Sequence, residues 1–170
     1  MNTIRDEMRV TKRTGQYEDI KFDKILKRVK TIGEEQNIKL GFSPLCLKVI
    51  DQLYDGIPTA KIDELMAEQC ASLISDHPDY GRLAAAVSIS NLHKNTSNSF
   101  YETMKQLWTF SDVNDVPTSL VSQDLWTVVN GNTQELEDML DYKRDYLIDY
   151  FGLKTLERAY LMRTNNVIVE

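Results

Sequence analysis

The sequence contains few of the residues that build metal and redox sites. Its 170 residues include only two cysteines, Cys46 and Cys70, and two histidines, His77 and His93. The cysteines form no CxxC pair and fall at apolar positions, which predicts buried structural thiols rather than a zinc site or a redox pair. Neither histidine belongs to a spaced set of Cys, Asp or Glu that is typical of a metal site. We therefore expect neither a metal site nor a redox cofactor within this chain.

Long hydrophobic runs and the common catalytic motifs are also missing. No stretch approaches the roughly 18 uninterrupted apolar residues of a transmembrane helix, and residues 1–7 lack the apolar centre of a signal peptide. We therefore expect a cytoplasmic protein with no membrane partner. The sequence also has no GxxxxGK[ST] loop, no GxGxxG turn and no GxSxG elbow. Nothing in it resembles a complete active site.

Positive charge is scarce overall but concentrated near the start of the chain. The 20 Lys and Arg are outnumbered by 26 Asp and Glu, and the net charge of -6 argues against a general nucleic-acid binder. Residues 8–30 nevertheless hold eight Lys and Arg against three acids. Such a basic island in an acidic chain suits a compact, multiply charged anion, although an ordinary solvated helix face would have the same composition.

The same basic region predicts a β-hairpin followed by a helix. Residues 9–13 and 17–21 alternate side-chain types and flank Thr14-Gly15-Gln16, where glycine allows the positive φ of a tight turn. Asp23 is expected to cap the helix that follows, whose apolar residues recur at helical spacing: Ile25, Leu26, Val29 and Ile32. Because two strands alone are marginally stable, the hairpin should lie across helices as a lid.

Three further helices are predicted before residue 98. Pro44 lies near the first turn of the second helix and Gly56 is its expected stop, with an apolar face made of Leu47, Ile50, Leu53 and Tyr54. Thr59 is expected to cap the third helix, which places Asp63 one turn later. The turn at residues 77–79 precedes an alanine-rich fourth helix that presents Lys94 near its end.

The composition changes after about Asn98, where a second, more acidic and aromatic helical segment begins. A polar turn with Pro117 interrupts it. Near the end, Thr164-Asn165-Asn166 predicts a turn that leads into an apolar strand without a partner. An unpaired terminal strand is unusual for a finished domain, so we expect that the chain has been cut from a longer protein.

Several of these stretches resemble a known family. "VTKRTGQYEDIKFDKI", "LYDGIPTAKIDELMAE" and "HPDYGRLAAAVSISNLHK" resemble the ATP-cone domain at the N-terminus of the large subunit of class I ribonucleotide reductase. "YFGLKTLERAYLM" is similar to the opening of that enzyme's catalytic part, in its eukaryotic and large-DNA-virus form. The resemblance implies a mainly α fold, with a short β-hairpin lid over a four-helix ATP-cone in residues 8–98. A helical segment of the catalytic part would occupy residues 99–170.

The resemblance also implies an allosteric site for ATP and dATP, which would account for the basic island. The positions that match it are Lys12, Arg13, Glu18, Asp19, Ile20, Lys21, Phe22, Asp23, Lys24, Thr59, Asp63 and Lys94. The cations suit the roughly four negative charges of a triphosphate, bound together with Mg²⁺. Glu18 would accept a hydrogen bond from the adenine amino group, and Asp63 would bind ribose hydroxyls.

The family's partners and chemistry follow as further expectations. The expected partners are other copies of the large subunit, which would form a nucleotide-dependent oligomer, and the small radical-generating subunit. Thr14 stands where the family commonly has an acid, which should alter the turn more than binding. The family's catalytic barrel and its cysteines are expected beyond Glu170, so this chain alone should not reduce ribonucleotides.

Two alternatives remain open from the sequence. One is a stand-alone nucleotide-sensing regulatory or interaction module, although such regulators usually attach the cone to a zinc ribbon, which needs CxxC pairs. The other is a helical scaffold without a ligand, which explains the periodicity but not the basic hairpin.

Overall fold

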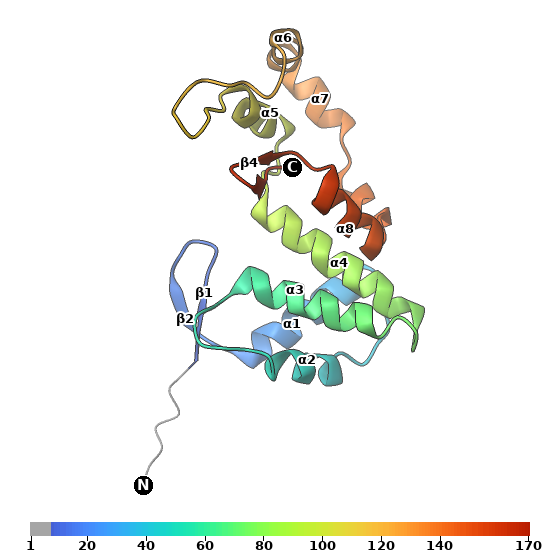
Figure 1. The fold of residues 1–170 in the computed structure, drawn as a ribbon. Coiled ribbons are helices and arrows are strands. Elements are labelled where there is room, and N and C mark those ends of the chain that lie inside the picture. Colours follow the sequence, from blue (N-terminus) through green and yellow to red (C-terminus); the bar gives the residue numbers. More distant parts are fainter. Residues whose placement is uncertain (1–7) are drawn as a thin grey trace. The chain divides into compact units, whose positions relative to one another are not determined.

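A computed structural model describes residues 8–170 and divides them into two compact units. The first contains residues 8–92 and 148–153, and the second contains residues 93–147 and 154–170. The described chain is mainly helical, with a small β-hairpin at its start (Figure 1), which confirms the predicted fold class. No helix in residues 8–170 is long and apolar enough to cross a bilayer.

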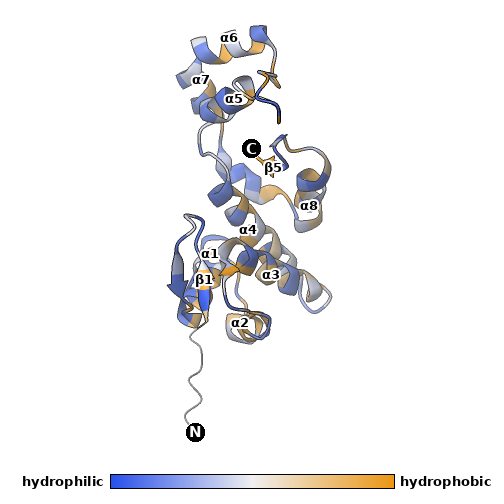
Figure 2. Ribbon diagram, turned by 60° about the vertical axis from the view of Figure 1, so that its left-hand side comes forward, coloured by the Kyte–Doolittle hydropathy of each residue, from blue (hydrophilic) through white to orange (hydrophobic). Residues whose placement is uncertain are grey.

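The first unit combines a small sheet with helices. Its elements are β1 (Arg9–Thr11), β2 (Tyr17–Asp19), α1 (Phe22–Glu35), α2 (Phe42–Ile50), β3 (Ile57–Pro58), α3 (Thr59–Ser72) and most of α4 (Pro78–Asn95). Apolar residues on one side of each helix form its core. Those of α1 are Ile25, Val29 and Ile32, as the sequence predicted. Figure 2 shows orange and blue segments alternating along these helices, as amphipathic helices around a core require.

The sheet has the order β2-β1-β3. β1 pairs antiparallel with β2, so that Val10 lies opposite Glu18. The turn between them closes through hydrogen bonds between Lys12 and both Gly15 and Gln16, and Gly15 has a φ of 81°, as predicted. The third strand was not predicted: β3 pairs parallel with β1 and places Ile57 beside Val10, both of them buried. The hairpin is therefore anchored to the segment that leads directly into α3.

Close packing between α1 and α2 depends on one glycine. A Cβ atom on Gly33 would lie 2.5 Å from Cζ of Phe42, well inside van der Waals contact. The ring of Phe42 therefore occupies the space that any other residue at position 33 would fill.

The predicted boundaries and faces of three helices need correction. The residue before α1 is Lys21 and the one before α3 is Pro58, and neither makes a side-chain capping bond, so neither Asp23 nor Thr59 is a cap. Both lie inside the first turn instead, because each helix begins one or two residues earlier than predicted.

The second helix also differs from its prediction. α2 ends at Ile50, six residues before Gly56, because the amides of Gln52 and Leu53 bond three residues back and taper the helix into a turn. Gly56, with a φ of 80°, belongs to the turn before β3. The buried face of α2 is Leu45, Cys46 and Val49, whereas the predicted Leu47 and Tyr54 are exposed. Periodicity alone could not choose between the two faces of this helix that carry apolar residues.

The second unit is built around a smaller core. Its elements are the end of α4, α5 (Phe100–Trp108), α6 (Gln123–Gly131), α7 (Thr133–Met139), the 3₁₀-helix η1 (Tyr142–Leu147), much of α8 (Tyr150–Ala159), β4 (Arg163–Thr164) and β5 (Val167–Ile168). Met104, Leu107, Val129 and Val169 are buried together, with Tyr101 and Trp126 packed against them.

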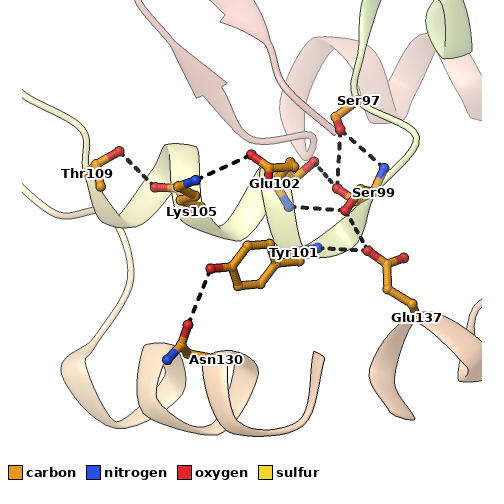
Figure 3. Close-up of polar contacts among 9 residues, drawn as sticks. Ser97, Ser99, Tyr101, Glu102, Lys105, Thr109, Asn130 and Glu137 are labelled. Carbon is orange, nitrogen blue, oxygen red and sulfur yellow. Dashed lines mark hydrogen bonds and ion pairs between the residues drawn. The ribbon is translucent and has the colours of Figure 1, made fainter. Parts of the chain in front are cut away.

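Polar side chains at the start of α5 join it to α7 (Figure 3). Ser99 caps α5 by accepting a hydrogen bond from the amide of Glu102. The Glu137 carboxylate on α7 accepts from the Ser99 hydroxyl at 2.6 Å and from the Tyr101 amide at 3.0 Å. These bonds lower the pKa of Glu137, the Ser99 hydroxyl having the larger effect.

The C-terminal strand has a partner, contrary to the prediction. β4 and β5 pair antiparallel, with Thr164 opposite Val167. Asn165 and Asn166 have φ values of 50° and 64°, which is the geometry of a type I′ hairpin turn. The predicted turn is thus correct, but β4, which is only two residues long, was too short to recognise as a strand.

Candidate functional site

A buried carboxylate joins three elements of the first unit. Asp63, on α3, is only 7 % exposed. Its Oδ1 accepts from Nε of Arg28 at 3.2 Å, and its Oδ2 accepts from Nη2 of Arg28 at 3.0 Å. Nη2 of Arg13, just beyond β1, lies 3.4 Å from Oδ2. Two guanidinium groups therefore neutralise one acid that burial alone would destabilise.

Polar residues of α4 complete this network. Arg13 also donates to the side-chain carbonyl of Asn91, and the amide nitrogen of Asn91 donates to the Ala60 carbonyl at 3.3 Å. Arg28 also donates to the Ser90 hydroxyl at 3.1 Å. The hairpin, α1, α3 and α4 therefore meet around Asp63.

A second cluster lies between the hairpin and the start of α1. Glu18, on β2, forms an ion pair with Lys12, whose Nζ lies 2.8 Å from Oε2. Nζ of Lys24, in the first turn of α1, donates to the other oxygen of Glu18. These two lysines, first through their hydrogen bonds, lower the pKa of Glu18 from 4.5 to about 2. Glu18 is therefore ionised at neutral pH.

The segment between Glu18 and Lys24 connects β2 to α1. The Ile20 amide donates to the Met8 carbonyl at 2.9 Å, which extends the pairing of the hairpin by one step. The side chains of the other four residues are exposed: Asp19, Lys21, Phe22 and Asp23. Phe22 is 43 % exposed, which is unusual for an aromatic ring next to a core. Asp23 follows it in the first helical turn.

Two predicted residues remain, Thr59 and Lys94. Thr59 begins α3, one turn before Asp63, and is partly buried. Lys94 lies exposed in the last turn of α4, three residues after Asn91, in the part of the helix that belongs to the second unit. The structure thus brings together Lys12, Glu18 and Lys24 in one cluster and Arg13 and Asp63 in another.

Sequence reasoning missed Arg28, Ser90 and Asn91. Arg28 carried a detectable signal, because it lies three residues after Ile25 and four before Ile32, within the buried stripe of α1. A cation at such a position needs a buried acid as partner. Ser90 and Asn91 gave no comparable signal, since polar residues near the end of a helix are common.

The arrangement is suited to binding an anion with polar groups attached. Four cations, Lys12, Arg13, Lys24 and Arg28, lie near two acids, so the site keeps a positive balance. The first turn of α1 adds a positive dipole end without a side-chain cap. Among residues 8–170, no group of three or more His, Cys, Asp and Glu is arranged to hold a metal ion.

Residues 8–95 match the family model described as the ATP cone domain. The chain belongs to the ATP-cone family. The match covers the hairpin and all four helices of the cone, and it includes every residue of both clusters. Membership supports a nucleotide effector for this chain.

The chain is also similar to large subunits of ribonucleoside-diphosphate reductase. It is 42 % identical over 163 residues to the subunit of Plasmodium falciparum (isolate Dd2), covering 96 % of this chain and 20 % of that protein. It is 42 % identical over 170 residues to that of Dictyostelium discoideum, with 96 % and 19 % covered. The Variola virus subunit is 39 % identical over 165 residues, with 96 % and 21 % covered.

These relatives confirm the resemblance to the eukaryotic and viral form of the subunit. The chain spans about one fifth of the length of the curated relatives it matches. Together, the ATP cone and these similarities support a nucleotide-binding regulatory region.

Proposed function

We propose that this chain is the activity-regulating, ATP- and dATP-binding region of a ribonucleoside-diphosphate reductase large subunit, and so belongs to deoxyribonucleotide biosynthesis. The observation that carries the proposal is two adjoining sets of contacts within an ATP cone: Lys12 and Lys24 pair with Glu18, and Arg13, the residue after Lys12, pairs with Asp63. Cations for phosphates and an acid for sugar hydroxyls are what a nucleoside triphosphate requires.

The phosphates would bind at the hairpin and the start of α1. Lys12, Arg13 and Lys24 would donate charge-assisted hydrogen bonds to them, and Lys94 would approach from α4. The positive dipole end at the first turn of α1, which no side chain caps, favours an anion at the same place. Mg²⁺, when bound, would neutralise phosphate charge. Because the described residues offer no cluster of acidic ligands, the phosphates themselves would hold most of its coordination.

The base and the sugar would be recognised by the acids. Glu18 would accept from the adenine amino group, which guanine lacks at that position, while the segment from Asp19 to Asp23 would close over the nucleotide. Asp63 and Thr59 would bind the sugar. ATP and dATP differ by one hydroxyl, which is worth about 1 to 1.5 kcal/mol per hydrogen bond, so their affinities should differ by about a factor of ten.

The regulatory step would be a change of assembly. ATP would favour one oligomer of the large subunit and dATP another, and activity with the small radical-generating subunit would follow. An effector can bias such an equilibrium only through its different affinities for the two states. Because Asp63 bonds to Arg13 and Arg28, a change at the sugar reaches the hairpin, α1 and α4 together.

Titration calorimetry with ATP, dATP and GTP tests the proposal. The wild-type chain should bind ATP and dATP and bind GTP more weakly. Lys12→Ala should weaken ATP binding by roughly tenfold, because it removes one charge-assisted bond while the fold is retained. Lys48→Ala, an exposed lysine of α2, is the matched control and should bind as the wild type does. Absence of ATP and dATP binding by the wild type would refute the proposal.

A further inference from the structure

Glu18 forms ion pairs with the two lysines that the proposed function assigns to the phosphates. Each of its two carboxylate oxygens is paired with a different lysine, Oε2 with Lys12 and Oε1 with Lys24. The carboxylate belongs to β2, Lys12 follows β1, and Lys24 lies on α1. A single acid on β2 therefore holds together cations from two other segments, the end of β1 and the start of α1.

This pairing is a specific arrangement rather than a chance surface contact. Val10 opposes Glu18 across the hairpin, and Val10 is buried, so the register that places Glu18 is fixed by the core. The neighbouring acid, Asp63, does not compete for these lysines, because its oxygens face Arg13 and Arg28. The depressed pKa of Glu18, about 2, agrees with a carboxylate held between two ammonium groups.

We infer that Glu18 is an internal counter-ion of the phosphate site, which holds Lys12 and Lys24 in place until a triphosphate displaces it. The inference rests on the proposed function, because it concerns the same site. The exchange is purely electrostatic: phosphate oxygens take over the two ammonium groups, and the carboxylate is released. No covalent bond forms or breaks.

The displacement would give Glu18 two successive roles. Once released, its carboxylate can accept a hydrogen bond from an adenine amino group nearby. A guanine nucleotide would release the same carboxylate but present a carbonyl oxygen where adenine has its amino group, and a carboxylate facing another acceptor is unfavourable. The internal counter-ion therefore lowers affinity for any triphosphate and restores part of that affinity only for adenine.

Inorganic tripolyphosphate separates these roles, because it has the phosphates but no base. Its affinity is measured by titration calorimetry for the wild-type chain, Glu18→Gln and Glu34→Gln. Glu34 is an exposed acid near the other end of α1, so its substitution raises the net charge equally. Glu18→Gln should bind tripolyphosphate roughly three- to tenfold more tightly than wild type, the range expected for freeing two partly exposed ion pairs. Glu34→Gln should change the affinity less than twofold, since its charge is distant and screened.

A second measurement is the ratio of ATP to GTP affinity. This ratio should fall in Glu18→Gln, because the released group is no longer a carboxylate, and stay at the wild-type value in Glu34→Gln. Equal or weaker tripolyphosphate binding by Glu18→Gln overturns the inference while leaving the proposed function intact, provided that wild type binds ATP. An equal increase in tripolyphosphate affinity in both variants overturns it too, because the change in net charge that they share would then explain the effect. If the wild type binds neither ATP nor dATP, the proposed function fails, and the inference with it.

Discussion

Arg28 is the residue whose loss should most clearly reveal the network around Asp63. Arg28→Met keeps most of the apolar stem and removes the guanidinium group. Three hydrogen bonds disappear with it: two to the carboxylate of Asp63, at 3.2 and 3.0 Å, and one to the Ser90 hydroxyl, at 3.1 Å. Asp63 stays buried and, of these two arginines, keeps Arg13, whose Nη2 lies 3.4 Å away.

The expected loss follows from these contacts. Breaking a fully buried ion pair costs about 3 to 5 kcal/mol, and hydrogen bonds to charged groups contribute about 1.5 to 3 kcal/mol. The Arg28 side chain is 26 % exposed, so water screens the pair, and Arg13 still neutralises the acid. We therefore expect the free energy of unfolding of the first unit to fall by about 2 kcal/mol at neutral pH.

Native-state hydrogen exchange is the suitable assay. Amides of α1 and α3 report on the first unit, whereas both tryptophans, Trp108 and Trp126, lie in the second. Lys27→Met, an exposed neighbour of Arg28 on the same helix, removes the same charge and should cost less than about 0.5 kcal/mol. Equal protection of α3 in the two variants would refute the assignment of Arg28 as the main partner of Asp63.

Three other substitutions test separate features. Gly33→Ala should destabilise the first unit by about 1 to 3 kcal/mol, because its Cβ would collide with Phe42, whereas Gly41→Ala, where nothing lies within 4 Å, should not; equal urea midpoints would contradict this packing. The native pKa of Glu137 lies below 4.5, so this group stabilises the second unit above that pH and the stabilisation is lost as the pH falls through the native value. Urea unfolding followed by tryptophan fluorescence should therefore show that wild type and the exposed control Glu135→Gln lose stability as the pH falls below 5. Glu137→Gln should lose less stability over the same range. Identical pH profiles for the three proteins would contradict this role of Glu137. Asp63→Asn should bring the ATP and dATP affinities closer together, and an unchanged ratio in calorimetry would remove Asp63 from sugar recognition.

Local signals in the sequence were sufficient for the hairpin and the core face of α1. Gly15 can adopt the positive φ that the turn needs, and Ile25, Val29 and Ile32 recur at a helical period with polar residues between them. In each case the determinant lies within a few residues of the structure it specifies. α2 lacked such a contrast, because hydrophobic residues occur on more than one of its faces, and its buried face was predicted wrongly.

Long-range pairing was the part that sequence could not supply. Nothing in the two residues of β3 indicates that they pair with β1, or that Arg28 and Asp63, 35 residues apart, share a bond. The resemblance to the ATP-cone family indicated Asp63 and the Lys and Arg residues expected to bind phosphate. It did not indicate that Glu18 would pair with those cations, because that contact depends on the register of the hairpin and the position of α1 together.

The pairing of β1 with β3 has a consequence for the order in which the protein folds. The Arg9 amide bonds to Asp55, 46 residues later, so the chain must close a long loop containing α1 and α2 before the hairpin is anchored. Closing a loop of this length lowers the entropy of the chain, and the long-range contacts that offset this loss form only after the loop has closed. The lid would therefore be completed late in folding and would open first when the protein is stressed. Proteolysis between β1 and β2 should then report local opening of the lid before the rest of the first unit unfolds.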